Sequence, residues 1–240
     1  MITQLVSPKG KEVLVGGAGP TILIGEKINP FGKGPIKEAL ISGNMEPVRD
    51  EAIKQVEAGA DVLIISVAAF GIDEVVTLPK ATQAVMEVSD VPICIESRNP
   101  VALEKALQLG CGKPIISSVT GEAIHLDQLL PLVKKYNTTF VALASDSSGV
   151  PGTAERRLEI ITDIVKRADG LGIDRANIIV DCVAESSAVN SNAATITLEA
   201  MDMVKQLWGL NLILGASNVS FGLPSRTVIN AVFLSLAVSR

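Results

Sequence analysis

The residues best suited to chemistry follow apolar runs that are typical of buried strands. In the stretch LILGASNVS, an apolar run meets Gly215 and is followed by Ser217, Asn218 and Ser220. The segment IIVD similarly ends an apolar run on Asp181. A carboxylate accepts hydrogen bonds, and a carboxamide both donates and accepts them, so the two groups suit a neutral, polar ligand. Asn218 and Asp181 are therefore the first candidates for catalysis.

Other expected strand ends also carry acidic or small polar side chains. These residues are Asn29, Ser66, Glu96, Ser117 and Asp146. The carboxyl ends of parallel strands in a barrel face one mouth, where such a fold binds its ligands. Carboxylates and carboxamides with few cations favour a donor-rich heterocycle. One example is the 2-amino-4-oxo pyrimidine edge of a pterin, whose N–H and NH₂ groups a carboxylate accepts together.

The elements that position these residues alternate regularly. Strands are expected at 21–28, 62–66, 92–96, 114–117, 140–145, 177–181 and 212–216, and amphipathic helices at 47–58, 78–88, 100–109, 126–136, 154–171, 195–208 and 227–238. Apolar strands alternating with helices indicate a parallel sheet, and this many units favour a TIM (β/α)₈-type barrel. The eighth strand-helix unit is absent from the 240 residues, as a truncation or as an open seam. We expect a single barrel domain over 1–240, with an N-terminal hairpin cap at 1–20 in which Val13–Val15 leads into the first long strand.

Composition excludes several functional classes. The chain has a net charge of -5 and no cluster of Lys or Arg, which argues against nucleic-acid and anionic-membrane partners. Three scattered cysteines and the single His125 do not form a common zinc signature or a histidine-based triad, so no bound metal is expected. The apolar runs are too short to span a bilayer and no signal peptide is found, so we expect a cytoplasmic protein.

Six segments carry a resemblance to a known family: GEKIN, EAGAD, ICIES, DSSGVP, IIVDC and above all LGASNVSFGLPSRTVIN. Together they resemble the pterin-binding methyltransferases, namely the methyltetrahydrofolate:corrinoid/iron-sulfur protein methyltransferases and the folate domain of cobalamin-dependent methionine synthase. The resemblance implies a homodimeric (β/α)₈ barrel that moves the N5 methyl group between methyltetrahydrofolate and the cobalamin of a partner corrinoid protein. It also implies that Asp181 holds the amino edge of the pterin and that Asn218 reaches N5.

The expected substrate-binding residues are Glu96, Ser117, Asn29, Ser66, Asp146, Ser217, Ser220 and Arg226, the last for the glutamate tail of folate. The chain departs from the family pattern at the second, third and fourth strand ends. Ile64 and Ser66 replace an Asp-x-Asn pair, Glu96 replaces an aspartate and Ser117 replaces an asparagine.

Alternatives remain open at this point. One is a dihydropteroate synthase-like enzyme, and another is a degenerate, non-catalytic barrel that binds a pterin or a corrinoid protein. Several candidate residues also have a possible structural role. Asp181 or the Ser217–Ser220 cluster could cap a following helix, and Glu96 could form an ion pair with Arg98 or Lys27.

Overall fold

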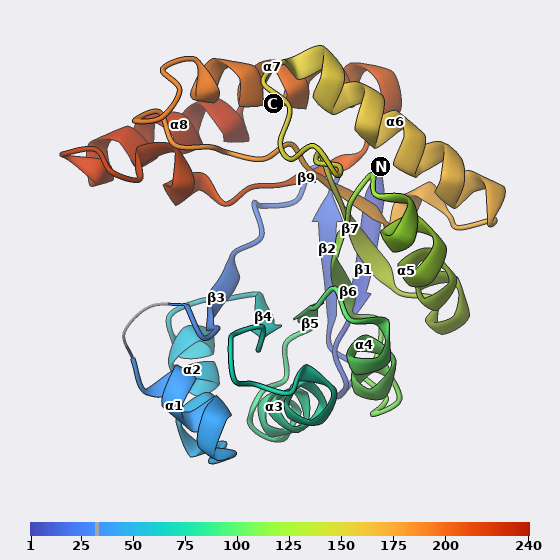
Figure 1. Cartoon of the computed structure of the whole chain (residues 1–240), viewed down its shortest axis with the longest axis vertical. Helices are drawn as coiled ribbons and strands as arrows, with labels where there is room; N and C mark the ends of the chain where they lie inside the picture. Colours follow the sequence, from blue (N-terminus) through green and yellow to red (C-terminus); the bar gives the residue numbers. More distant parts are fainter. Residues whose placement is uncertain (32–33) are drawn as a thin grey trace. The chain divides into compact units, whose positions relative to one another are not determined.

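The computed structural model describes residues 1–31 and 34–240 (Figure 1). The chain divides into two compact units. The first, called here the N-terminal unit, comprises residues 2–118 and 128–140, and the second, the C-terminal unit, comprises residue 1 with 119–127 and 141–240. The strands of the main sheet follow chain order, β3-β4-β5-β6-β7-β8-β9.

The chain begins with an antiparallel hairpin of β1 (Ile2–Val6) and β2 (Glu12–Gly16). Both strands lie within residues 1–20, where a hairpin cap was expected. The role of this hairpin as a cap stays a prediction. Val6 and Lys113 exchange backbone hydrogen bonds of 3.2 and 2.8 Å. These bonds attach the hairpin to the chain just before β6 (Ile115–Val119).

The N-terminal unit is built from parallel β/α units. Its parallel pairs join β3 (Ile24–Ile28) to β4 (Val62–Ser66), β4 to β5 (Ile93–Glu96), and β5 to β6. The helices are α1 (Pro35–Ser42), α2 (Glu46–Glu57), α3 (Glu74–Val88) and α4 (Pro100–Leu107). Asp73 and Asn99 cap α3 and α4 by accepting hydrogen bonds from backbone N–H groups of the first turn, which fixes where these helices begin.

α5 (Ala123–Tyr136) and β7 (Thr139–Leu143) contribute residues to both units. The C-terminal unit continues with α6 (Ala154–Gly170), the 3-10 turn η1 (Arg175–Asn177), β8 (Ile178–Asp181), α7 (Ala193–Trp208), β9 (Asn211–Ile213), the 3-10 turn η2 (Ala216–Ser220) and α8 (Arg226–Val238). β8 and β9 are parallel, with Asp181 opposite Ile213. This register places the end of β8 beside the last residue of β9.

The observed elements follow the expected alternation closely, but one helix was not expected and several element boundaries differ. Helix α1 was not expected, because it follows a Gly- and Pro-rich segment that suggested only a loop. The strand expected at 212–216 ends at Ile213, and the chain then turns into η2. In residues 1–31 and 34–240, none of the helices combines the length and the apolar character that crossing a membrane would require.

Candidate pterin site

Asp181 lies at the carboxyl end of β8, where it is half-buried. Its Oδ1 accepts a hydrogen bond of 2.8 Å from the backbone N–H of Val183, two residues later. Burial raises the pKa of Asp181 from 3.8 to about 6, opposed by this hydrogen bond and by the charge of Arg157. The carboxylate is therefore ionised at neutral pH. It does not cap the next helix, which begins only at Ala193.

The loop that follows Asp181 is held by Arg157 of α6, a residue that the sequence reasoning missed. Its guanidinium is fully buried and donates through Nη1 to the carbonyls of Cys182 at 2.8 Å and Val183 at 2.6 Å. Nη2 pairs with the Glu185 carboxylate at 2.5 Å. A signal was present, because Arg157 falls on the helix face whose other buried members are apolar: Ala154, Ile160, Ile161, Ile164, Val165 and Ala168.

Asn218 lies in η2, and its side chain is exposed. Its Nδ2 would lie 3.1 Å from a Cβ built on Gly215, so glycine at that position leaves room for the carboxamide. Within the described residues of the C-terminal unit, no hydrogen bond engages this carboxamide. Asn218 is therefore available to donate to, or accept from, a bound ligand.

The neighbours of Asn218 form a network of their own. The Ser220 hydroxyl donates to the Ser217 carbonyl at 3.2 Å and accepts from Arg226 Nε at 3.0 Å. Arg226 Nη2 donates to the same Ser217 carbonyl at 3.0 Å. Ser220 is buried whereas Arg226 is exposed. These bonds fix the shape of η2, and the ligand contacts expected for Ser217, Ser220 and Arg226 stay predictions.

The loop after β8 is bonded directly to the segment that carries Asn218. The hydroxyl of Ser186 donates to the carbonyl of Phe221, and the backbone N–H of Ser187 donates to the carbonyl of Val219 at 2.9 Å. Both acceptors lie in or just after η2. The segment that follows Asp181 and the segment that carries Asn218 are therefore hydrogen-bonded to each other within the C-terminal unit.

Asp146 follows β7 in the same unit and is engaged by its own loop. Its Oδ1 accepts from the backbone N–H of Ser148 at 2.9 Å and from the Ser148 hydroxyl at 2.5 Å. Oδ2 pairs with Arg156 at 3.0 Å. The hydrogen bonds from Ser148, followed by the influence of Arg156, lower the pKa of Asp146. Its expected ligand contact stays a prediction.

In the N-terminal unit, three expected site residues lie side by side on adjacent strands: Ser66 and Glu96 end β4 and β5, and Ser117 lies in the middle of β6. Glu96 lies opposite Ser66 on one side and opposite Ser117 on the other. Burial raises the pKa of Glu96, opposed by the charge of Arg98 and reinforced by that of Glu26. Ser66 is buried, and its hydroxyl has no hydrogen-bond partner in the described part of the chain. A buried hydroxyl without a partner is unusual in proteins and consistent with a site for a ligand.

Asn29 lies in a pocket of about 210 Å³ in the N-terminal unit, lined by Lys27, Asn29, Phe31, Gly34, Ile36, Lys37 and Glu51. Its carboxamide donates to the Glu26 carbonyl and accepts from the backbone N–H of Phe31 at 2.9 Å. The amide nitrogen and the amide oxygen of Asn29 therefore both bond to the backbone of the turn in which Asn29 lies. Residues 32 and 33 of the expected loop lie outside the described residues.

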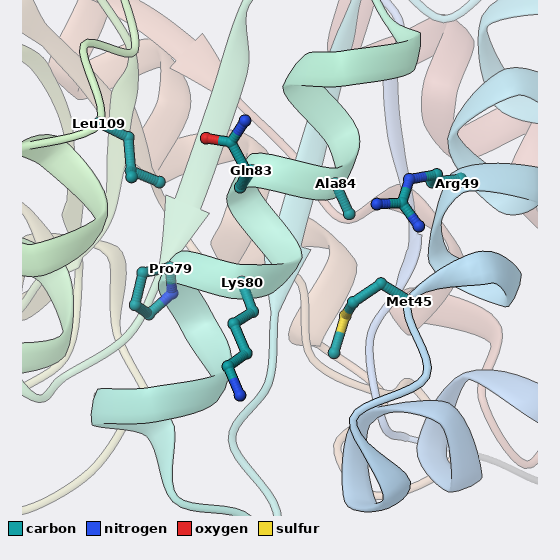
Figure 2. Close-up of a pocket in the computed structure, with 7 residues that line it drawn as sticks. All are labelled: Met45, Arg49, Pro79, Lys80, Gln83, Ala84 and Leu109. Atoms are coloured by element: carbon teal, nitrogen blue, oxygen red, sulfur yellow. The ribbon is translucent and has the colours of Figure 1, made fainter.

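A larger pocket of about 370 Å³ lies in the same unit and is shown in Figure 2. It is lined by Met45, Arg49, Pro79, Lys80, Gln83, Ala84 and Leu109. Arg49, one of its two cations, already pairs with Glu46 at 2.8 Å and with Glu87 at 2.7 Å. The pocket contains none of the residues expected to bind substrate.

Comparison with known proteins decides the family. A family model described as pterin binding enzyme matches residues 32–240. The chain belongs to this family. The pterin-binding chain is 32% identical over 223 residues to the methylcorrinoid:tetrahydrofolate methyltransferase of Eubacterium limosum, covering 90% of this chain and 81% of that protein. It is 28% identical over 226 residues to the methionine synthase of Mycobacterium leprae (strain TN), covering 89% of this chain but 19% of that protein.

Solved structures confirm the fold class of the pterin-binding chain. The dihydropteroate synthase of Thermus thermophilus matches with a TM-score of 0.72 at 17% identity, covering 98% of this chain and 90% of the other. The dihydropteroate synthase of Coxiella burnetii in complex with pteroic acid matches with a TM-score of 0.67 at 18% identity, covering 98% of this chain and 89% of the other. At these identities the likeness shows the fold alone. The expected family and the expected TIM-barrel class are both confirmed.

Proposed function

We propose that this pterin-binding enzyme is a methyltransferase that moves a methyl group between N5 of tetrahydrofolate and the cobalt of a corrinoid carried by a partner protein. The names of the relatives from Eubacterium limosum and Mycobacterium leprae support the reaction class. The observation that carries the proposal is the pairing of a partly buried carboxylate, Asp181, with an unengaged carboxamide, Asn218, on hydrogen-bonded segments of one unit.

Asp181 is suited to recognising the amino edge of the pterin ring. One of its oxygens is committed to the Val183 N–H, and within the described residues of its unit the other oxygen has no hydrogen bond. An ionised carboxylate in a desolvated position accepts N–H donors more strongly than a neutral acceptor does. Because a ring N–H and an NH₂ group lie side by side on the pterin, we propose that they bind to this carboxylate.

Asn218 is suited to the reacting nitrogen. When the N5–CH₃ bond breaks, its electron pair stays on N5, the methyl carbon forms a bond with the electron pair of Co(I), and N5 gains a proton from water. A carboxamide NH₂ can donate to the developing lone pair on N5 without titrating itself. In the reverse direction the N5 lone pair would form the bond to the methyl carbon, the Co–C electron pair would stay on cobalt as Co(I), and the N5 proton would pass to water. The same carboxamide would orient the ring.

The remaining expected contacts are proposed as separate contributions to pterin or folate binding. Glu96, Ser66 and Ser117 present one carboxylate and two hydroxyls in register on adjacent strands of the N-terminal unit. Asn29, Asp146, Ser217 and Ser220 contribute only if the ligand displaces or shares the internal hydrogen bonds they now make. Arg226, exposed beside Phe221, is proposed for the glutamate tail of folate.

The decisive experiment mixes the protein with methyltetrahydrofolate and a reduced corrinoid and follows the Co(I) absorbance band, and the reverse reaction starts from methylcorrinoid and tetrahydrofolate. Enzyme-dependent change in either direction supports the proposal. Pterin binding in calorimetry without transfer to a free or protein-bound corrinoid would instead select a non-catalytic binding protein. Condensation of a pterin pyrophosphate with p-aminobenzoate would select a dihydropteroate synthase. The expected homodimer is tested by sedimentation velocity.

A further inference from the structure

We infer that Arg157 is a positioning residue of the pterin site, acting through the peptide of Val183 to hold the Asp181 carboxylate in its binding orientation. The effect of Arg157 on ligand binding rests on the proposed function. The contacts that support this inference lie wholly within the C-terminal unit and do not depend on the identity of the ligand.

The link begins with the backbone of Val183, which has a φ of 62°. A β-branched residue in the left-handed region is a genuine outlier, because its side chain crowds the backbone there. Such strain costs roughly 1–3 kcal/mol and persists only where surrounding contacts hold the residue firmly. In this conformation the N–H of Val183 turns back to Asp181 Oδ1 at 2.8 Å. The strained residue therefore orients the carboxylate.

The contacts that hold the strained residue come mainly from Arg157. The Val183 carbonyl accepts from Arg157 Nη1 at 2.6 Å and from the Thr197 hydroxyl at 2.9 Å. The preceding carbonyl, that of Cys182, accepts from the same Nη1 at 2.8 Å, while Nε donates to the Pro151 carbonyl at 2.9 Å. The Arg157 side chain thus binds the carbonyl before the Val183 N–H and the carbonyl after it.

The guanidinium is suited to this task in a way that an ammonium group is not. Arginine presents five donors in a rigid planar fork, whereas lysine has three donors on a flexible stem. Arg157 is fully buried, and its ion-pair partner Glu185 has a side chain that is 39% exposed. A lysine at this position keeps the charge but cannot reach Pro151, Cys182, Val183 and Glu185 together.

Two influences of Arg157 converge on Asp181. Its charge lowers the pKa of the Asp181 carboxyl directly, and the Val183 N–H that it holds in place lowers it as well, both against the effect of burial. The same loop continues to Ser186 and Ser187, which are bonded to the segment carrying Asn218. Loosening the Arg157 contacts should therefore change the protonation of Asp181 and not only the stability of the fold.

The test compares Arg157→Lys with Arg167→Lys, a control on the exposed part of the same helix where Arg167 pairs with Asp127. The pKa of the Asp181 carboxyl is measured in ligand-free protein by carbon-detected NMR, with Asp181→Asn assigning the signal. We expect Arg157→Lys to raise this pKa by about one unit, which by itself weakens tetrahydrofolate binding at pH 6.5 by about threefold. The lost orientation of the carboxylate should bring the total loss to roughly tenfold. Arg167→Lys should change neither. An unchanged Asp181 pKa in folded Arg157→Lys overturns the inference.

Rescue adds a sharper criterion, because glycine adopts a positive φ without steric cost. In a Val183→Gly background, Arg157→Lys should weaken tetrahydrofolate binding by less than about threefold. An equal loss in both backgrounds would contradict the role assigned to Val183. If Arg157→Lys does not fold, Thr197→Val removes the other donor to the Val183 carbonyl without changing charge, and the Asp181 pKa must still rise. Failure of the wild type to bind tetrahydrofolate rejects the proposed function, while the ligand-free pKa still decides the inference.

Discussion

Replacing Asp181 with asparagine should stabilise the protein while impairing its binding site. The asparagine carbonyl can still accept from the Val183 N–H, so the loop geometry is kept. The negative charge, which burial makes costly, disappears. An ordinary surface aspartate would show no gain in stability on this substitution, so the sign of the change tests the reasoning.

The magnitude follows from the pKa of Asp181, which rises from 3.8 to about 6 on folding. Each pKa unit corresponds to about 1.4 kcal/mol, so the ionised carboxylate lowers the free energy of unfolding at neutral pH by up to about 3 kcal/mol. Because the folded-state pKa is raised, the favourable contribution of protonated Asp181 is complete below pH 3.8 and is lost as pH rises through about 6. Asp181→Asn should therefore match the wild type below about pH 4 and exceed it above about pH 6.

The assay is urea unfolding at several pH values together with calorimetric binding of tetrahydrofolate. Loss of charge-assisted hydrogen bonds worth about 1.5–3 kcal/mol should weaken binding roughly tenfold to 150-fold. Wild-type affinity should also fall about tenfold per pH unit below about pH 6, and this dependence should vanish in the variant. Asp146→Asn is the matched control: since hydrogen bonds lower the pKa of Asp146, this variant should lose stability at neutral pH. Unchanged pterin affinity, or reduced stability at pH 7, in Asp181→Asn would refute the reasoning.

Three further substitutions test other parts of the site. Asn218→Ala should slow methyl transfer by roughly 10²–10³-fold in stopped-flow measurements of Co(I) absorbance, with little change in the Kd for the pterin; an equal loss in Kd would assign Asn218 to binding rather than to the reacting nitrogen. Ser66→Ala removes a buried hydroxyl that lacks a partner among the described residues and should raise the free energy of unfolding by about 1 kcal/mol in urea titration, whereas a loss of stability would reveal an internal role. Glu96→Gln removes a carboxylate whose pKa burial raises, so it should increase stability at neutral pH and weaken pterin binding; unaltered binding would remove Glu96 from the site.

The alternation of strands and helices was predictable because apolar runs of the parallel strands end abruptly in polar residues. The strand expected at 62–66 coincides with β4, and those expected at 92–96 and 177–181 differ from β5 and β8 by one residue at the start. Asp181 was predictable for the same reason, since it ends the apolar strand β8. Asn218 was found by its polar cluster after an apolar run, although it lies in η2 and not at a strand end. The local pattern of apolar and polar residues was thus enough to predict the main candidate site residues.

Features that depend on tertiary contacts were less accessible. Strand β1, which pairs with β2, was not expected, because a short apolar strand does not show which strand it pairs with. Helix α3 begins at Glu74, before the expected residue 78, because the side chain of Asp73 caps it by accepting a hydrogen bond from the backbone N–H of Val75, a local signal that was overlooked. Arg157 resembled any charged residue on an amphipathic helix until its burial face was considered. The engagement of Ser217, Ser220 and Arg226 with one another could not be read from their spacing alone.

The way Arg157 holds the loop after β8 has a consequence for how this protein family can diverge. The loop is fixed through carbonyl and N–H groups of residues 182 and 183, which every amino acid except proline supplies in full. The identity of the side chain at 183 is therefore loosely constrained, and glycine or asparagine would suit its left-handed backbone at least as well as valine. Among homologues that share this loop geometry, we expect residue 183 to drift while an arginine at 157 and a hydroxyl at 197 persist. Two sequences can then carry the same carboxylate geometry with no shared motif after the aspartate.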